Sequence, residues 1–521
     1  MMTADGLTDR VRRRIARLAG DGVAARIWRR DVSVWSRDPA TPELADRLGW
    51  LELAHTMQRH VADVTSFAEA ARRRFARVVL CGMGGSSLAP EVLWRTFGRR
   101  AGYPELHLLD STHPGAVRAA APPGVLDTTL FLIASKSGTT IETASFDRYF
   151  WESTGGRGEQ FVAITDPGTV LAQSAVERGF RHVFLNPPDI GGRFSALSLF
   201  GLVPAALIGL DVERLLAGAR EAEGALHTPG AENPGVALGA LMAEAALAGR
   251  DKCTLVTDEP LAALGLWVEQ LVAESTGKAG RGVLPVVGEN AADLSGAEPD
   301  RVLVLRTLGS GPAPATAALG ARASAAGAPV DAAVLPSVYG LGAEFLRWEF
   351  ATGVAGAVLQ VNPFDQPNVA ESKANTSRVL SAGTPPTSTD DAAAIGTWLR
   401  GVRAGDYVAV MAYVPPTPAA DARLAGLRRA LERRLHVAVT TGYGPRFLHS
   451  TGQYHKGGPP RGHFVQVVDR PEPMTPIPGA PYDFGRLIAA QADGDLQALR
   501  ARGRPAIRVD DGDGLWQEVG A

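Results

Sequence analysis

The sequence predicts an α/β protein whose parallel sheets are covered by helices on both faces. Two observations lead to this fold class: short apolar runs that end in glycine or a polar residue recur along the chain, and segments with helical periodicity separate them. A third is the length of 521 residues, which exceeds what one hydrophobic core usually holds. We expect two doubly wound domains, with a helical segment before them and a smaller α/β unit after them.

Four parts follow one another along the chain. Apolar residues recur at helical spacing through residues 1–75, the expected N-terminal helical segment. Residues 76–235 should form the first domain, with buried strands at "ARVVLCG", "LHLLD", "LFLIAS", "FVAIT" and "HVFLN". Residues 236–380 should form the second, with strands at "TLVTD", "RVLVLR" and "DAAVLP". The segment 381–391, "SAGTPPTSTDD", has linker composition, and the C-terminal α/β unit at 392–521 should hold strands at "YVAVMAYV", "HVAVTTG" and "HFVQVV".

The balance of charges and the two cysteines exclude several classes of protein. Fifty-three basic residues against 55 acidic ones give a net charge of −2, so no general attraction to nucleic acid or to anionic lipid is expected. Cys81 and Cys253 stand in apolar runs without metal-ligand spacing, which predicts buried thiols, no disulfide framework and no metal site. The first residues lack the apolar stretch of a secretory signal, and the longest uncharged run, "FSALSLFGLVPAALIGL", is too short to span a membrane. A cytoplasmic protein with a buried helix at that run is therefore expected.

Residues 135–140, "SKSGTT", gather four hydroxyl side chains between a predicted strand and a predicted helix. In a parallel sheet this junction lies at the carboxyl edge, where ligands bind, and a helix start offers unpaired N–H groups. A capping box between Thr139 and Glu142 is the simpler alternative, but it accounts for only one or two hydroxyls. We therefore expect this segment to bind a phosphate group, through Ser135, Lys136, Ser137, Thr140 and Thr143.

A second predicted strand end carries a glycine turn. The segment "CGMGGSSLAPEV" places Gly84, Gly85 and Ser86 between a strand and a helix, where they also suit an anion. The turn lacks the full dinucleotide-binding pattern, and "STGKAG" lacks the residues of a P-loop. Two anion-binding turns at neighbouring strand ends favour a phosphorylated small molecule over a nucleotide.

Several motifs in sequential order resemble the phosphoglucose isomerase family, which is built from two sugar isomerase domains. They span residues 81–376 and comprise "GMGGSSLAPEV", "SKSGTTIET", "GGRFSALS", "VEQLVAESTGK" and "NPFDQPNVAESK"; "HSTGQYHKGGP" extends the resemblance into the C-terminal unit. The chain is similar to the isomerase half of fused transaldolase/phosphoglucose isomerase proteins and has no transaldolase barrel. The resemblance implies an enzyme of glycolysis and gluconeogenesis that interconverts glucose 6-phosphate and fructose 6-phosphate and needs no metal or organic cofactor.

Such a reaction moves a proton between C1 and C2 through an enediolate. It needs a base, a cation beside the developing oxyanion and a group that opens the sugar ring. The resemblance implies that Glu274 is the base and Arg193 the cation, while Gln270, one helical turn before Glu274, would reach the same pocket. Without the motifs, a solvated carboxylate at a helix end and a structural ion pair would be the simpler interpretations.

The remaining roles fall on later residues. The resemblance places Lys373 near the ring oxygen and makes Gln366 a phosphate ligand, although a lysine on a helix is usually surface charge. The family has a histidine between the base and the lysine, but residues 275–372 contain none. His455 is therefore our candidate for assisting ring opening and His449 the reserve, and either could instead only hold a loop.

A sugar phosphate is the expected partner, with no nucleic acid and no membrane, and the displaced histidine leaves a homodimer with shared sites open. Two alternatives remain: a non-catalytic sugar-phosphate sensing module, and an isomerase of another hexose phosphate, such as mannose 6-phosphate or an amino-sugar phosphate. Sensing modules usually accompany a DNA-binding helix-turn-helix, which the basic N-terminus does not convincingly form. Retention of Glu274, Arg193 and Lys373 together favours turnover.

Overall fold

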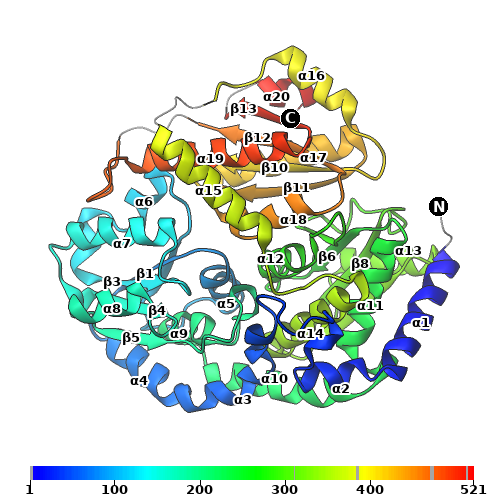
Figure 1. Cartoon of the computed structure of the whole chain (residues 1–521), viewed down its shortest axis with the longest axis horizontal. Helices are drawn as coiled ribbons and strands as arrows, with labels where there is room; N and C mark the ends of the chain where they lie inside the picture. Colours follow the sequence, from blue (N-terminus) through cyan, green and yellow to red (C-terminus); the bar gives the residue numbers. More distant parts are fainter. Residues whose placement is uncertain (1–3, 310, 383–386, 470–473, 512–513, 521) are drawn as a thin grey trace.

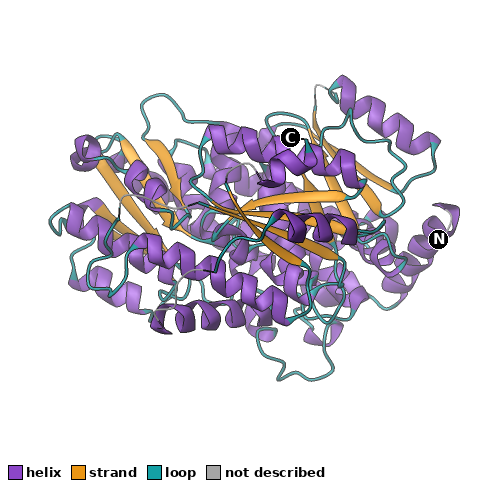
Figure 2. Cartoon of the chain, turned by 90° about the horizontal axis from the view of Figure 1, so that it is seen from above, coloured by secondary structure: helices purple, strands orange, loops and turns teal. Residues whose placement is uncertain are grey.

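Three parallel sheets organise the protein, one in each of three lobes (Figure 1). The structure is a computed structural model that describes residues 4–309, 311–382, 387–469, 474–511 and 514–520. Helices lie on both sides of the strands (Figure 2), as the alternation of apolar runs and helical segments predicts. The predicted α/β class with parallel sheets is therefore confirmed.

The first sheet has the strand order β2-β1-β3-β4-β5, and all neighbouring pairs are parallel. The five predicted runs are all strands here, and β1, β3 and β4 are buried almost throughout because helices cover both faces. Their bounds are β1 Arg77–Gly82, β2 Glu105–Leu109, β3 Thr129–Ala134, β4 Phe161–Thr165 and β5 His182–Leu185.

The second sheet has the order β7-β6-β8-β9 and is also parallel. The three predicted strands are present as β6 Lys252–Thr257, β8 Arg301–Leu308 and β9 Val330–Leu335. A further strand, β7 Leu284–Val287, was not predicted, because "LPVV" is only four residues long and contains a proline.

The third sheet has the order β11-β10-β12-β13, again parallel. The predicted strands are β10 Tyr407–Tyr413, β11 Ala438–Tyr443 and β12 Gly462–Val468. The fourth, β13 Ala506–Asp510, was not predicted, because Arg508 interrupts its apolar pattern. Arg508 is nevertheless buried, and it donates to Asp493 Oδ1 at 2.6 Å. Residues 383–386 of the predicted linker lie outside the described residues.

All three sheets share one topology. In each, the first strand lies between the second and the third, so the direction of winding reverses between the first strand and the third. Ligands of open α/β sheets bind in the crevice at the carboxyl ends of those two strands. The fold thus offers three equivalent crevices, one for each sheet. The exact boundaries of the four predicted parts stay predictions.

The helices cover the sheets and connect the lobes. The N-terminal segment is helical for most of its length, and its first helix packs against α11 beside the second sheet. The bounds are α1 Ala4–Gly20, α2 Val23–Trp28, α3 Leu53–Thr56, α4 Val61–Ala71, α5 Leu88–Phe97, α6 Pro114–Ala120, α7 Ile141–Ser153, α8 Val170–Glu177, α9 Leu199–Leu207, α10 Val212–His227, α11 Pro234–Leu247, α12 Leu264–Thr276, α13 Pro314–Ala325, α14 Leu341–Leu359, α15 Pro367–Ala382, α16 Ala392–Gly401, α17 Pro418–Leu435, α18 Gly452–Gly457, α19 Phe484–Ala501 and α20 Gly514–Val519.

One hydrophobic core runs through the first two lobes, and α12 lies where all three lobes meet. It packs against α5, α14 and α18 and is buried on nearly every side. Every residue of α9 is buried, which confirms the predicted core helix. Cys81 and Cys253 are buried free thiols, as predicted, and burial raises the pKa of Cys253 to about 12.

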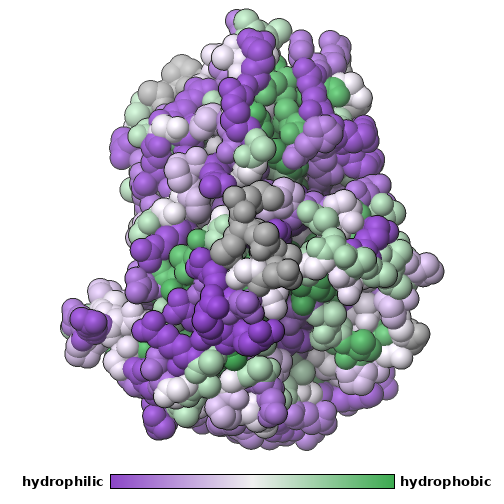
Figure 3. Space-filling view, turned by 90° about the vertical axis from the view of Figure 1, so that its right-hand side faces the viewer, coloured by the Kyte–Doolittle hydropathy of each residue, from purple (hydrophilic) through white to green (hydrophobic). Residues whose placement is uncertain are grey.

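Hydrophilic side chains cover most of the face drawn in Figure 3, and hydrophobic ones form small separate patches there. Among the helices of the described residues, none combines the length and the apolar character that crossing a lipid bilayer requires.

Candidate active site

A cavity of about 650 Å³ opens at the carboxyl edge of the first sheet. It lies beyond the ends of β1 and β3, the two strands between which the winding reverses, and α12 of the second lobe closes its far side. Most of the predicted site residues line it: Gly84, Gly85, Ser86, Ser135, Lys136, Ser137, Thr140, Arg193, Gln270, Glu274 and Gln366, with the reserve histidine His449.

The glycine turn after β1 forms the short 3-10 helix η5, Gly84–Ser86. Gly84 adopts a left-handed φ of 55°, which favours glycine. A Cβ atom on Gly85 would lie only 1.9 Å from the carbonyl oxygen of Gly192. The turn therefore packs directly against η8, Gly192–Phe194, and this close approach brings the predicted anion-binding turn beside Arg193.

The hydroxyl-rich segment follows β3 and precedes α7. Ser135 Oγ and Thr140 Oγ1 are 3.0 Å apart, as are Ser137 Oγ and Thr139 Oγ1. Thr140 is the N-cap residue of α7, and its side chain makes no capping hydrogen bond. The N-cap position therefore falls on Thr140, not on Thr139, and a capping box between Thr139 and Glu142 does not explain the hydroxyl groups of this segment. Thr143 is buried one turn further along α7 and does not line the cavity.

Lys136 lies at the cavity wall, but its ammonium group is paired. It forms an ion pair with Asp166 and donates to the carbonyl oxygen of Pro188 at 2.9 Å. Burial raises the pKa of Asp166, and the charge of Lys136 opposes that rise. The ammonium group of Lys136, which we expected to bind a phosphate, is therefore largely neutralised by the carboxylate of Asp166.

Arg193 is buried and holds the first two lobes together. Its Nε donates to Ser275 Oγ at 2.8 Å and its Nη1 to Gln366 Oε1 at 2.7 Å. Its Nη2 donates to the carbonyl oxygens of Pro363 at 2.6 Å and Asp365 at 2.8 Å. Burial lowers the pKa of Arg193, while nearby carboxylates act in the opposite direction. The guanidinium group thus fixes the loop that carries Gln366 at the cavity.

Glu274 projects from the last turn of α12 and is buried. One of its oxygens, Oε1, lies 3.7 Å from Nη1 of Arg193. The other, Oε2, accepts a 3.1 Å hydrogen bond from Nε2 of Gln270, four residues earlier on the same helix face. The same amide nitrogen donates to the carbonyl oxygen of His449 at 2.8 Å. A buried carboxylate, a guanidinium and an orienting amide therefore meet at one wall.

The two candidate histidines lie in different places. His449 ends η11, Arg446–His449, of the third lobe; it lines the cavity, with its Nε2 3.1 Å from Glu142 Oε1. His455 lies outside this cavity: its Nδ1 is 3.0 Å from the hydroxyl oxygen of Tyr407, and burial lowers its pKa well below the usual range. The structure therefore brings the reserve residue to the site and leaves the first candidate, which is buried, outside it. Lys373 belongs to α15, but its side chain lies outside the described residues.

Some wall residues had no local signal in the sequence. Glu43 and Arg47 come from the N-terminal segment; they lie 3.2 Å apart, and Glu43 accepts a 3.1 Å hydrogen bond from Gln366. Only the long-range fold brings them here. Lys278, in "STGKAG", is buried beside this wall and pairs with Asp365 at 2.6 Å. Burial, together with the charge of Arg193, lowers the pKa of Lys278 to about 7.

Comparison with known proteins agrees with this geometry. Residues 51–285 match the family model of phosphoglucose isomerase. The matched region carries both predicted anion-binding turns, Arg193, Gln270 and Glu274, and the resemblance seen in the motifs is confirmed for it. Gln366, Lys373 and His449 lie beyond it.

Several curated relatives, named glucose-6-phosphate isomerase, match part of this chain. The chain is 36% identical over 264 residues to the glucose-6-phosphate isomerase of Rubrobacter xylanophilus, which covers 46% of this chain and 60% of that protein. It is 33% identical over 262 residues to the glucose-6-phosphate isomerase of Thermosynechococcus vestitus, covering 47% and 48%. The chain thus spans about half to three fifths of the length of the curated relatives it matches.

Solved structures extend the likeness to a larger share of the fold. A hypothetical protein from Thermus thermophilus superposes with a TM-score of 0.61 at 26% identity, over 70% of this chain and 96% of that one. A glucose-6-phosphate isomerase from Chlamydia trachomatis superposes with a TM-score of 0.55 at 21% identity, over 68% and 78%. The second comparison shows a shared fold alone.

Proposed function

We propose that the protein interconverts glucose 6-phosphate and fructose 6-phosphate by proton transfer through an enediolate, as an enzyme of glycolysis and gluconeogenesis. The observation that carries the proposal is the meeting of Glu274 and Arg193 in the same cavity as the two hydroxyl- and glycine-rich turns. The family match over residues 51–285 and the names of the curated relatives support it.

The phosphate group binds at the carboxyl edge of the first sheet. The hydroxyls of Ser135, Ser137 and Thr140 surround the start of α7, whose N–H groups and positive dipole end favour an anion. The glycine turn of η5 adds backbone N–H groups from a neighbouring strand end. This end of the cavity holds the substrate and leaves its sugar carbons near α12.

Glu274 moves the proton between C1 and C2. Its contact with Arg193 matters because the enediolate intermediate is anionic at the two oxygens that change their bonding. Arginine stays protonated at neutral pH, so it can stabilise that charge without exchanging the proton. Gln270 donates to Glu274 and thereby fixes the direction in which the carboxylate points.

Ring opening is assigned to His449, because it lies in the cavity and His455 does not. The carboxyl group of Glu142 lies beside its Nε2 and can hold the ring in one orientation. Lys373 keeps its expected place near the ring oxygen as a prediction. All of these groups come from one chain, and a homodimer stays an open prediction.

A coupled assay of the purified protein with fructose 6-phosphate tests the proposal. We expect turnover in the wild type and a loss of kcat of roughly a thousandfold or more in Glu274→Gln, which keeps the shape of the side chain and removes the base. Glu221→Gln, an exposed change on α10, is the matched control and should leave kcat unchanged.

The same experiment separates the alternatives. Equal activity in wild type and Glu274→Gln would remove this residue from its role. Micromolar binding of fructose 6-phosphate without turnover in either would favour the sensing module. Faster turnover of mannose 6-phosphate or of an amino-sugar phosphate would show that the protein is an isomerase of that sugar phosphate instead.

A further inference from the structure

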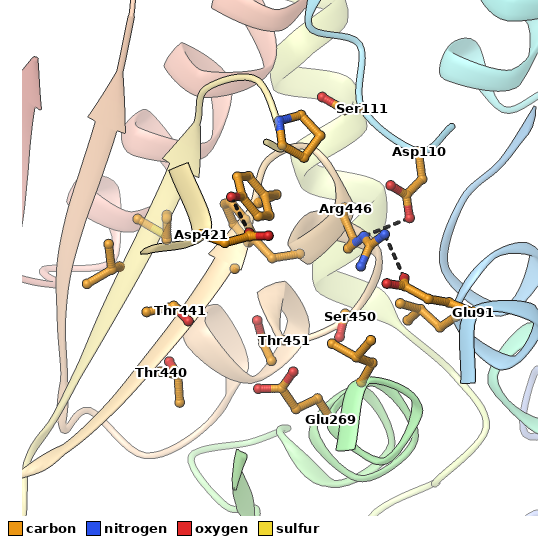
Figure 4. A pocket seen from close by; sticks show the side chains of 18 of the residues that line it. Glu91, Asp110, Ser111, Glu269, Asp421, Thr440, Thr441, Arg446, Ser450 and Thr451 are labelled. Carbon is orange, nitrogen blue, oxygen red and sulfur yellow. Dashed lines mark hydrogen bonds and ion pairs between the residues drawn. The ribbon is translucent and has the colours of Figure 1, made fainter. Parts of the chain in front are cut away.

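A second cavity, of about 300 Å³, lies where the three lobes meet (Figure 4). Its walls come from α5 of the first lobe, α12 of the second, and the strands β10 and β11 with η11 of the third. No residue of this cavity was assigned a role by the sequence motifs except His455, which lines it and whose Nδ1 lies 3.0 Å from the hydroxyl oxygen of Tyr407. It is separate from the candidate active site, and α12 lies between the two.

Glu269 is the buried group that faces this cavity without a partner. Its side chain projects from α12 toward Thr451 (Figure 4). Only 9% of the residue is exposed, and among the described residues no hydrogen bond or ion pair engages its carboxyl group. Burial raises the pKa of Glu269 to about 8, against the opposing influence of Arg428 and Arg446. A buried carboxyl group without a partner costs free energy unless a ligand engages it.

The other charges around the cavity are already paired. Arg446 contacts Glu91 Oε2 at 2.8 Å and Asp110 Oδ2 at 2.7 Å, as the dashed lines in Figure 4 show. Arg95 also pairs with Glu91, at 3.4 Å. Asp421 accepts a 2.6 Å hydrogen bond from the hydroxyl group of Tyr443.

These pairs leave a surplus of acid groups. Four carboxyl groups line the cavity, from Glu91, Asp110, Asp421 and Glu269, against two guanidinium groups. The lining histidine, His455, adds no charge, because burial lowers its pKa well below the usual range. The Asp421 carboxylate has no ion-pair partner among the described residues, and Glu269 becomes a second unpaired carboxylate once a cation lies beside it, so this lining favours a cation over a phosphate. Several hydroxyl groups line the same space: Ser111, Thr440, Thr441, Ser450 and Thr451.

We propose that this cavity binds a small organic cation that also carries hydroxyl groups, with its ammonium group against Glu269 and its hydroxyls along Thr440, Thr441 and Thr451. The space suits a molecule of about the size of a monosaccharide, and the acid surplus selects a cation over a neutral or anionic molecule of the same shape. Among the described residues, no group of acidic, histidine and cysteine side chains could hold a metal ion, so a metal is not the expected cation.

The same helices and turns form walls of both cavities, so we infer that a ligand in the new cavity affects the candidate active site. This coupling, unlike the binding itself, rests on the proposed isomerase function. Along α12, Glu269 faces one cavity and Gln270 the other. Along η11, Arg446 faces the new cavity, while His449 faces the candidate active site. The segment after β1 also contributes to both: η5 lines the candidate active site, and α5 lines the new cavity. A ligand at Glu269 therefore contacts the elements that hold Gln270, His449 and η5.

Calorimetric titration of the full chain with glucosamine tests the site, with glucose and gluconate as neutral and anionic probes of similar size. We expect glucosamine to bind at least about tenfold more tightly than glucose, the effect of one added buried charge pair, and gluconate not to bind. Because an ammonium group favours the ionised carboxylate, glucosamine binding at pH 6, where both the amino group of the sugar and Glu269 start protonated, should release close to one proton, visible as a dependence on the ionisation enthalpy of the buffer.

Variants locate the binding. Glu269→Gln should weaken glucosamine at least about tenfold and abolish the proton release, and Glu221→Gln should change neither. Should Glu269→Gln fold poorly, Thr451→Val, a change of similar volume, should weaken glucosamine several-fold through the loss of one hydroxyl. Equal binding of glucose and glucosamine, full affinity in both variants, or displacement of glucosamine by fructose 6-phosphate would each overturn the proposal.

Calorimetry needs no turnover, so the new site can be judged even if the proposed isomerase activity fails. Where turnover is present, glucosamine should change kcat at saturating fructose 6-phosphate in the wild type and leave it unchanged in Glu269→Gln. An equal response in both proteins would overturn the coupling.

Discussion

The first and second sheets have the same strand order, but their carboxyl edges are occupied differently. At the first, the space beyond β1 and β3 is an open cavity lined by hydroxyls and a glycine turn. At the second, Asp258 directly follows β6 and reaches the start of α13, the helix after β8. Its Oδ2 accepts from the backbone N–H of Ala313 at 2.7 Å and its Oδ1 from Thr316 Oγ1 at 2.6 Å.

Two sheets of the same topology can therefore have one open crevice and one filled crevice. A helix start at the crevice attracts an anion in either sheet. In the second sheet the chain supplies that anion itself, as the Asp258 carboxylate, so the place is filled. In the first sheet small hydroxyls and glycines leave it open for a ligand. Four experiments test this contrast between the two edges, beginning with the most damaging change.

Placing a carboxylate at the first edge should have the largest effect. Ser137→Asp imitates the second sheet at an exposed position of the cavity wall. A negative charge beside the substrate phosphate should lower kcat/KM for fructose 6-phosphate by roughly a hundredfold. Ser137→Ala should cost only several-fold, and Ser377→Asp, on an exposed position of α15, should cost nothing. Normal activity in Ser137→Asp would place the phosphate elsewhere.

Widening the gap between η5 and η8 should follow. Gly85→Ala puts a Cβ atom 1.9 Å from the Gly192 carbonyl oxygen, which only backbone movement can relieve. We expect a loss of about 2 to 3 kcal/mol in the free energy of unfolding by urea, together with reduced activity. Gly192→Ala faces open space from the other side of the same contact and should change stability by less than about 0.5 kcal/mol. Similar losses in both variants would show that the close approach is not the cause.

Removing the carboxylate from the second edge should have a smaller effect, and on stability alone. Asp258→Ala deletes the acceptor for Ala313 and Thr316, which should cost about 1 kcal/mol in thermal or urea unfolding. Activity with fructose 6-phosphate should be unchanged. A drop in turnover would mean that the second edge contributes to catalysis and that the comparison is too simple.

Over the half unit from pH 7.5 to 8, a pH dependence common to all these variants should be the smallest effect, below about 0.7 kcal/mol in the free energy of unfolding. Glu269 lies away from both edges, and its pKa of about 8 in the folded protein exceeds that of an unfolded glutamate. Between pH 4.5 and 8 the folded state therefore holds the extra proton, so stability falls as pH rises, by at most about 1.4 kcal/mol per pH unit. Glu269→Gln should remove this contribution, while Asp258→Ala and Ser137→Ala should keep it.

Local pattern was enough to predict most of the framework and part of the site. The runs that became β1 and β3 are apolar and are followed by glycine or hydroxyl residues, so both the strands and the turns after them follow from near neighbours in sequence. Strand β7 was not predicted, because four residues are too short to show a strand pattern. Strand β13 was not predicted, because its sequence contains Arg508, and the buried partner Asp493 that this arginine contacts cannot be identified from local sequence.

The rest of the site depends on contacts between distant segments. Thr139 and Glu142 have capping-box spacing, yet Glu142 instead lies beside His449 and accepts from Gln491, more than 300 residues away. Likewise, the choice between His449 and His455 could not be made from one short motif that contains both. Their separation, with His449 at the candidate active site and His455 at the second cavity, appears only when η11 packs against η5 and α18 against α12.

The position of His449 also sets an order of events during synthesis. Ribosomes add residues from the N-terminus and domains fold as they emerge, so the first sheet and the two turns at its edge can form long before η11 exists. The cavity gains its last wall only when the third lobe docks. A nascent chain stalled before that point would carry the two turns proposed to bind phosphate without the histidine that faces them.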